Sequence, residues 1–197
     1  MRKVFKLLYL VGLAIACVHC QSSQVQNIKI PDAKVEADLP GFKKKNKALW
    51  YDGKPFSGYR FTKHPNGKTA TITGYWQGKK EGEAKAFYAS GRPRYQKFYH
   101  KGKRVKKHYG WYSTGKKRFE RQYQDGLMVG VEKMYFRNGR LAVERHFKNG
   151  KEQGAQKEWN QKGKIVSNYV VKKGRRYGVL GRKNCVSVYK NEKTNKN

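Results

Sequence analysis

Basic residues follow glycine at many points of this chain, and this pairing is the first feature that could bind a ligand. In the stretch MYFRNGRLAVERHFKNGKEQG, residues 134–154, Asn-Gly-Arg and Asn-Gly-Lys stand eleven residues apart. A glycine followed by a cation can hold a phosphate where a helix begins, because the helix N-terminus points N–H groups at the anion. Here the next segment, RLAVERHF, alternates with a period of two, which is typical of a strand. The pattern therefore predicts hairpin turns instead of a nucleotide loop.

These turns recur along the chain at a constant step. The predicted turn glycines form two series, Gly78, Gly102, Gly126 and Gly150, and Gly91, Gly115, Gly139 and Gly163, which Gly53, Gly67 and Gly174 extend. A lysine or arginine follows ten of these eleven glycines. We predict that eight of the ten bind an anionic ligand: Lys79, Arg92, Lys103, Lys116, Arg140, Lys151, Lys164 and Arg175. The alternative is that a lysine beside a turn glycine serves only solubility.

Short strands must position these cations. The segments between glycines alternate, so each 24-residue unit is expected to hold two antiparallel strands and two turns. The two turn series then lie on opposite edges, with a cation about every 10 Å along each edge. One aromatic residue recurs three positions before the first glycine, as Trp50, Tyr75, Tyr99, Tyr123 and Phe147, and is expected to stack into a continuous apolar spine. We predict an all-β fold: an elongated, single-layer antiparallel β-meander of about eleven strands, stacked over residues 49–189 as five full repeats and a partial sixth.

The segment FKNGKEQGAQKEWNQKGK, residues 147–164, shows both halves of the unit. At these residues the chain resembles the MORN repeat, in the bacterial variant that reads roughly aromatic-x-x-Gly-Lys-x-x-x-Gly and then aromatic-x-x-x-Gly-basic. The resemblance covers residues 49–177, and it departs from the pattern at Lys63, His64 and Lys106. It implies a β-meander scaffold with no activity and no cofactor of its own. Family members are linked to membranes, acidic phospholipids and protein partners, and bacterial relatives of this variant to toxin–antitoxin pairs.

The charge of the chain favours anionic partners. Lys and Arg number 46 against 13 Asp and Glu, which gives a formal net charge of +33 at pH 7. We expect an anionic glycan, a lipopolysaccharide or an acidic protein as the partner. Nucleic acid would bind an exported protein only through nonspecific attraction of charges, and such binding is not expected physiologically.

The N-terminus predicts export. Three basic residues precede the uncharged run LLYLVGLAIACV, residues 7–18, as in a secretory signal. AIAC resembles a loose bacterial lipobox, which implies a signal peptide over residues 1–16 and acylation of Cys17, with Cys20 as the alternative. A plain cleaved signal remains open. Residues 17–48 are expected to form a polar tether or N-terminal cap without a packable pattern up to Pro40, and residues 190–197 a polar tail.

The chain shows no motif for catalysis or metal binding. Its histidines are scattered singly, and no P-loop, zinc-protease or nucleophile-elbow motif occurs. Glu81 and Glu83 stand two apart, which favours a solvated sheet edge. Cys-Val-His-Cys has zinc-like spacing but abuts the signal and lacks a second ligand pair. Whether Cys20 and Cys185 pair stays open.

We therefore expect a non-enzymatic, exported and lipid-anchored protein of the bacterial envelope, at the outer membrane or cell surface, or otherwise a periplasmic or secreted protein. Its expected role is adhesion or interaction through an anionic surface or an extracellular partner. The alternative is an antitoxin or immunity protein that neutralises a toxin by protein–protein binding. For that role an acidic toxin is expected, because a strongly basic chain repels a basic nuclease.

Overall fold

The computed structural model describes residues 28–180, and the structural statements below concern these residues. The predicted signal peptide, Cys17, Cys20, Cys185 and the predicted polar tail at residues 190–197 lie outside them. Every regular element within residues 28–180 is a β-strand. No helix of this part of the chain is long and apolar enough to cross a membrane.

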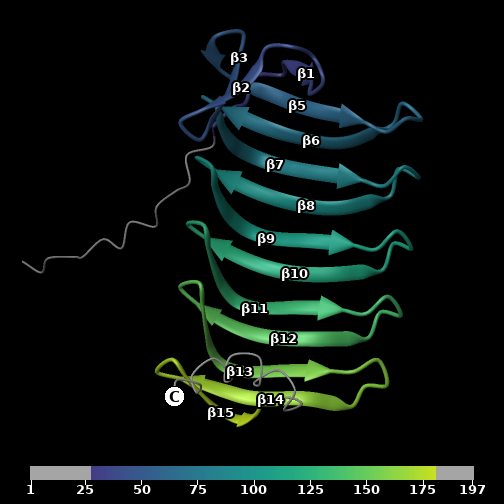
Figure 1. The fold of residues 1–197 in the computed structure, drawn as a ribbon, viewed down its shortest axis with the longest axis vertical. Helices are drawn as coiled ribbons and strands as arrows, with labels where there is room; N and C mark the ends of the chain where they lie inside the picture. The colour runs from purple at the N-terminus through teal and green to yellow at the C-terminus, as the bar shows by residue number, and fades with distance from the viewer. Residues whose placement is uncertain (1–27, 181–197) are drawn as a thin grey trace, which may run out of the picture.

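The strands form one long sheet and one small sheet (Figure 1). The long sheet has twelve strands, which lie in chain order: β1 (Lys34–Glu36), β5 (Gly58–Lys63), β6 (Thr69–Trp76), β7 (Lys79–Phe87), β8 (Pro93–His100), β9 (Lys103–Trp111), β10 (Lys117–Gln124), β11 (Leu127–Tyr135), β12 (Leu141–Lys148), β13 (Lys151–Trp159), β14 (Ile165–Lys172) and β15 (Arg175–Val179). From β5 onward each strand pairs antiparallel with the next. The predicted single-layer β-meander of stacked two-strand units is confirmed.

The two turn series differ in backbone geometry. In the first series two consecutive residues have positive φ, as at Lys101 (49°) and Gly102 (83°), which is the geometry of a type I′ hairpin turn. In the second series a four-residue turn is closed by the N–H of the glycine, as where Gly91 N donates to Tyr88 O at 2.8 Å. Turns of the first series also bond to the start of the strand that follows the preceding turn: Gly102 N donates to Lys80 O and Gly126 N to Arg104 O, both at 2.8 Å.

The N-terminal region differs from the sequence-based prediction. Residues 21–40 were expected to carry no packable pattern, yet β1 pairs parallel with β5 and covers the edge of the long sheet. The chain before it crosses the sheet at Gly74, where the Cδ1 atom of Ile30 lies 2.6 Å from the position a Cβ would take. The absence of a side chain at Gly74 is what lets Ile30 pack so closely.

The first predicted repeat is also divided. Trp50 lies in β3 (Ala48–Tyr51), which pairs with β2 (Phe42–Lys45) and β4 (Lys54–Pro55) to form the small three-stranded sheet. Pro55 has no N–H with which to extend the ladder, and the chain enters the long sheet only at Gly58. The small sheet therefore takes the first strand of unit one, and the prediction of five full repeats in one meander is wrong at this end.

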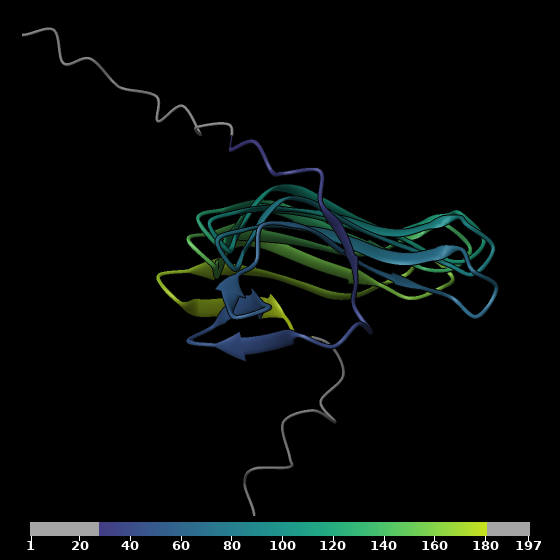
Figure 2. The same ribbon diagram turned by 90° about the horizontal axis from the view of Figure 1, so that it is seen from above.

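One face of the long sheet carries most of its buried side chains. This face, called the tyrosine face below, presents Tyr75, Tyr99 and Tyr123, and it also carries the small residues Ala84 and Ala86 of β7. Figure 2 shows the sheet curved, with the small sheet on the inner side of the curve, and the ring of Phe56 lies 5.9 Å from that of Tyr75. The buried side chains of the long sheet include Ala84, Ala86, His108, Tyr123, Glu132, Gln156, Tyr169 and Val171, all on this face.

The aromatic column is not a continuous apolar spine. His108 lies between two of its rings, 5.8 Å from Tyr99 and 4.6 Å from Tyr123. The Nζ atom of Lys80 lies 5.0 Å from the centre of the Tyr99 ring, and the Cζ atom of Arg104 lies 4.7 Å from that of Tyr123. In these two units cations pack between the rings, because the residue two positions after each first-series glycine points to the same face as the tyrosine opposite it.

Buried polar side chains satisfy the backbone where the ladder shifts register. The Nε2 atom of His108 lies 3.0 Å from both N and O of Phe98, so it can accept from one or donate to the other. Gln156, two units later, serves both groups of His146: its Oε1 accepts from the N–H at 3.1 Å and its Nε2 donates to the carbonyl at 3.0 Å. Each of these two side chains is at most 2% exposed. They hold equivalent β-bulges in different units.

Candidate anion-binding sites

The structure places the predicted turn cations along two opposite edges of the long sheet. Lys79, Lys103, Lys151 and Arg175 begin strands after turns of the first series, at the edge on the left of Figure 1. Arg92, Lys116, Arg140 and Lys164 follow turns of the second series, at the other edge. All eight are exposed. All eight predicted turn glycines, Gly78, Gly91, Gly102, Gly115, Gly126, Gly139, Gly150 and Gly163, have positive φ.

On the second edge the cations also bind the neighbouring turn. Arg92 Nη1 donates to Ser113 O at 3.2 Å, and Lys116 Nζ donates to Asn138 O at 2.9 Å. Arg140 Nη1 donates in the same way to a carbonyl of the next turn, Gln161 O, at 3.1 Å. Each of these side chains is thus directed along the edge toward the next unit. This structural role was not foreseen from the sequence, because it needs the stacking of successive turns in space.

On the first edge the lysine stems pack on the next turn instead. The Cβ of Lys79 lies 3.7 Å from the position that a Cβ would take at Gly102, and Lys103 has the same relation to Gly126. Leu127 replaces the lysine once and packs on Gly150 in the same way. The stem therefore contributes to packing while the ammonium group stays exposed at the edge.

The turn cations have no acidic partner within the described residues. The salt bridges of residues 28–180 connect other residues, most of them on the strands, and none uses any of the ten basic residues that follow turn glycines. Both edges are therefore rows of exposed charges that are not neutralised within this part of the chain.

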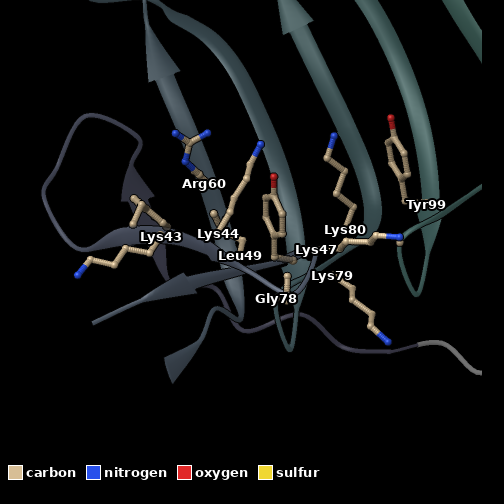
Figure 3. A pocket seen from close by; sticks show the side chains of 13 residues that line it. Lys43, Lys44, Lys47, Leu49, Arg60, Gly78, Lys79, Lys80 and Tyr99 are labelled. Carbon is tan, nitrogen blue, oxygen red and sulfur yellow. The ribbon is translucent and has the colours of Figure 1, made fainter. Parts of the chain in front are cut away.

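A second basic site lies where the small sheet meets the tyrosine face. A cleft of about 740 Å³ is lined by residues of both sheets. Its basic lining residues are Lys43, Lys44, Lys47, Arg60, Lys79 and Lys80, and no acidic residue lines it. Its aromatic lining residues are Phe42, Tyr75 and Tyr99. Figure 3 shows Lys44, Arg60, Lys80 and Tyr99 pointing to one side, and Lys43 and Lys79 pointing away.

The cations that line this cleft lie close enough to one another, and to Lys97 and Arg104 beside it on the tyrosine face, to affect their pKa values. Partial burial, followed by the charge of Lys44, lowers the pKa of Lys80. Partial burial also lowers the pKa of Lys97 on β8, and the charges of Lys80 and Arg104 add to this effect. Burial first, and then the neighbouring positive charges, make protonation of these lysines costlier than in water, and no carboxylate lines the cleft to offset this cost.

The isolated histidines and acids have structural partners. His64 Nε2 lies 3.0 Å from Phe87 O, and His100 Nδ1 lies 3.0 Å from Glu81 Oε1. Glu81 also accepts from Lys101 N at 2.8 Å and is 6% exposed, so the prediction of a solvated carboxylate at this position is wrong. No group of three or more His, Cys, Asp or Glu able to hold a metal occurs among the described residues.

The fold and these surfaces define a repeat protein of the β-meander class. A family model described as MORN repeat variant matches the chain twice, at residues 80–101 and 128–149. The starts of the two matches are two structural units apart, and each lies two positions after a first-series glycine. The matches support a relationship of this chain to the MORN-repeat family and a role as a repeat scaffold. A comparison with curated proteins finds no match.

The cleft is the feature that sequence analysis missed. The period of the repeat identifies Lys80 and Lys97 as strand residues, but nothing in the pattern joins them to Lys44, which stands in the predicted tether. The only available signal of a basic site is the FKKK sequence of β2. It carries three consecutive lysines and lacks the alternation of apolar and polar residues that is typical of a strand.

Proposed function

We propose that this protein is a non-enzymatic scaffold that binds an extended anionic partner through the basic edges of its long sheet. The partner is an anionic glycan, a lipopolysaccharide or an acidic protein, and the scaffold acts in adhesion or interaction at the bacterial envelope, to which an acylated Cys17 would attach it. The observation that carries the proposal is that ten of eleven turn positions are basic and that none of the ten has an acidic partner within residues 28–180.

The spacing of the two edges supports an extended partner. Two strands at about 4.8 Å separate successive cations of one edge, so the charges recur at about 10 Å. Phosphates or sulfates along a polymer or a lipid surface can meet several such cations at once. Because each contact releases counterions, retention on an anionic matrix is expected to fall steeply with salt.

Elution of the mature protein from heparin and from immobilised lipopolysaccharide tests the proposal. Two variants each lose four cations from one edge: Lys79, Lys103, Lys151 and Arg175 to Gln, and Arg92, Lys116, Arg140 and Lys164 to Gln. The matched control loses four cations from strand centres on the face opposite the tyrosines: Lys85, Lys107, Lys133 and Lys157 to Gln. We expect at least one edge variant to elute at clearly lower salt than the control.

Of the two edge variants, the first-edge variant gives the more direct test of charge. It leaves the turn-to-turn hydrogen bonds of Arg92, Lys116 and Arg140 intact, so its retention reports charge without a change at those turns. Equal elution of both edge variants and the control would reduce the binding to diffuse net charge and contradict the proposal.

A further inference from the structure

We infer that the cleft between the small sheet and the tyrosine face binds a compact organic polyphosphate, a small ring or short chain that bears at least two phosphate groups. This site has a different ligand and different central residues from the two edges. It therefore does not depend on the proposed function.

The first argument is the convergence of cations from separate elements. Lys44 comes from β2, Arg60 from β5 and Lys80 from β7, and the three point to the same side of the cleft (Figure 3). The register of β8 and β9 places Lys97 and Arg104 on the same face, next to Tyr99. None of these five cations takes part in a salt bridge with any residue that the structure describes.

The second argument is the number of negative charges that a ligand needs in order to neutralise this cluster of cations. Like charges held together repel, and the pKa values of Lys80 and Lys97 are lowered by partial burial first and then by the neighbouring cations. A single carboxylate supplies one negative charge and leaves most of the cluster uncompensated. Two phosphate groups supply about 1.5 to 2 negative charges each near neutral pH where they are monoesters, and lysine is a common point-charge partner of phosphate.

The third argument is the shape and lining of the cleft. Its volume of about 740 Å³ lies in the range of sites for small organic molecules. Tyr75, Tyr99 and Phe42 offer ring surfaces beside the charges, and Arg60 Cζ lies 5.1 Å from the centre of the Phe42 ring. The small sheet closes the cleft on one side, whereas an extended polymer fits the open edges. These features favour a ligand with a compact frame over a bare ion or a polymer.

Isothermal titration of the mature protein tests the inference, with inositol hexakisphosphate and inorganic tripolyphosphate as probes in about 0.15 M salt. Citrate serves as the carboxylate probe. The test variant is Lys80→Gln with Lys97→Gln. The matched control is Arg176→Gln with Arg145→Gln, which removes the cations at the same repeat positions, four and two units further on. Those two arginines already have acidic partners.

We expect saturable binding of inositol hexakisphosphate near one equivalent, and weaker binding of tripolyphosphate and of citrate. Affinity should fall at least about tenfold in the test variant, since each lost charge-assisted contact is worth about one order of magnitude, and at most about threefold in the control. Thermal denaturation of each variant without ligand checks that its fold is retained.

Three outcomes would overturn the inference: no saturable binding of either phosphate probe, equal weakening in both variants, or citrate binding as tightly as the hexakisphosphate. A phosphate-bearing lipid headgroup has the same chemistry, so vesicles containing phosphatidic acid form a further arm. Binding to these vesicles without binding of the soluble probes would also contradict a compact soluble ligand. The second-edge variant should keep its affinity for the hexakisphosphate, which separates a failure of the cleft from a failure of the edges.

Discussion

The two halves of the tyrosine face have similar backbones but differ in charge balance, since the cations are paired with carboxylates in only one of them. In the C-terminal half, Arg121 Nε lies 2.5 Å from the buried carboxylate of Glu132, and Arg176 Nη2 lies 2.9 Å from Glu152. Arg145 in the same half contacts Glu158 as well as Glu152. In the N-terminal half the equivalent cations have no acidic partner within residues 28–180. Lys97 stands one unit before Arg121, at the same repeat position, and faces Ala84 in the ladder.

One column of the repeat accounts for much of this difference. The positions across the ladder from the central cations Lys97, Arg121 and Arg145 read Ala84, His108, Glu132 and Gln156. The turns and the antiparallel ladder are kept in the units that carry these four residues, so the backbone there does not depend on which of these side chains is present. A repeat protein can therefore confine a binding site to two or three units by changing single positions within a constant scaffold.

The largest expected effect follows from removing the cation of the neutralised half. Arg121→Gln leaves the carboxylate of Glu132, whose residue is 4% exposed, buried without its partner. We expect the free energy of unfolding, measured by urea denaturation, to fall by about 2 to 3 kcal/mol. The matched change Lys97→Gln removes an unpaired cation and should leave the stability within about 0.5 kcal/mol or increase it. Equal destabilisation by the two substitutions would contradict the distinction between the halves.

The next effect concerns the buried side chains that hold the bulges. His108→Leu leaves the backbone groups of Phe98 without their side-chain partner and should cost about 1 to 3 kcal/mol in urea denaturation. His108→Gln, which copies Gln156, should be at least as stable as the parent, because an amide can serve the N–H and the carbonyl together. A His108→Gln variant as unstable as His108→Leu would show that the two bulges are not equivalent.

A smaller effect is expected when an acid is moved into the basic half. Lys80→Glu copies Glu152, which stands three units later at the same repeat position. The new carboxylate would face Lys97 and Lys44, and an exposed pair of this kind should raise the stability by at most about 1 kcal/mol at low salt. The gain should disappear at about 1 M salt, where the Debye length is short. The same variant should lose the binding of inositol hexakisphosphate. Retained binding would place that ligand elsewhere.

The smallest effect is a dependence of stability on pH. Burial, chiefly, and the charges of Lys97 and Arg104 lower the pKa of His108, while bonds to the backbone act in the opposite direction. The unfolded chain then binds a proton at higher pH than the folded chain does, so stability is present above about pH 6.5 and declines as the pH falls below this value. His108→Gln should remove this part of the decline. Urea denaturation from pH 7.5 to 5 of both proteins measures it, and identical pH profiles would exclude His108 as the cause.

The sequence by itself determined the unit and its repetition. Glycines that recur at a constant step require positive φ at fixed places, and alternation between them requires strands, so Gly78 to Gly174 predict the meander and both basic edges without any knowledge of long-range contacts. These features are local: each needs only the residues of one turn and the strands beside it.

Only the tertiary structure decided how the ends and the faces are used. The small sheet, which ends at Pro55, is separate from the meander and folds back against it. Lys44 therefore lies beside Lys80, although the two stand far apart in the chain. Whether a cation is neutralised likewise depends on the residue across the ladder, as for Arg121 and Glu132, and that residue is set by register and bulges. The charge balance of a site depends on residues from several strands that meet in space. The period of the repeat along the chain does not show which of these residues meet.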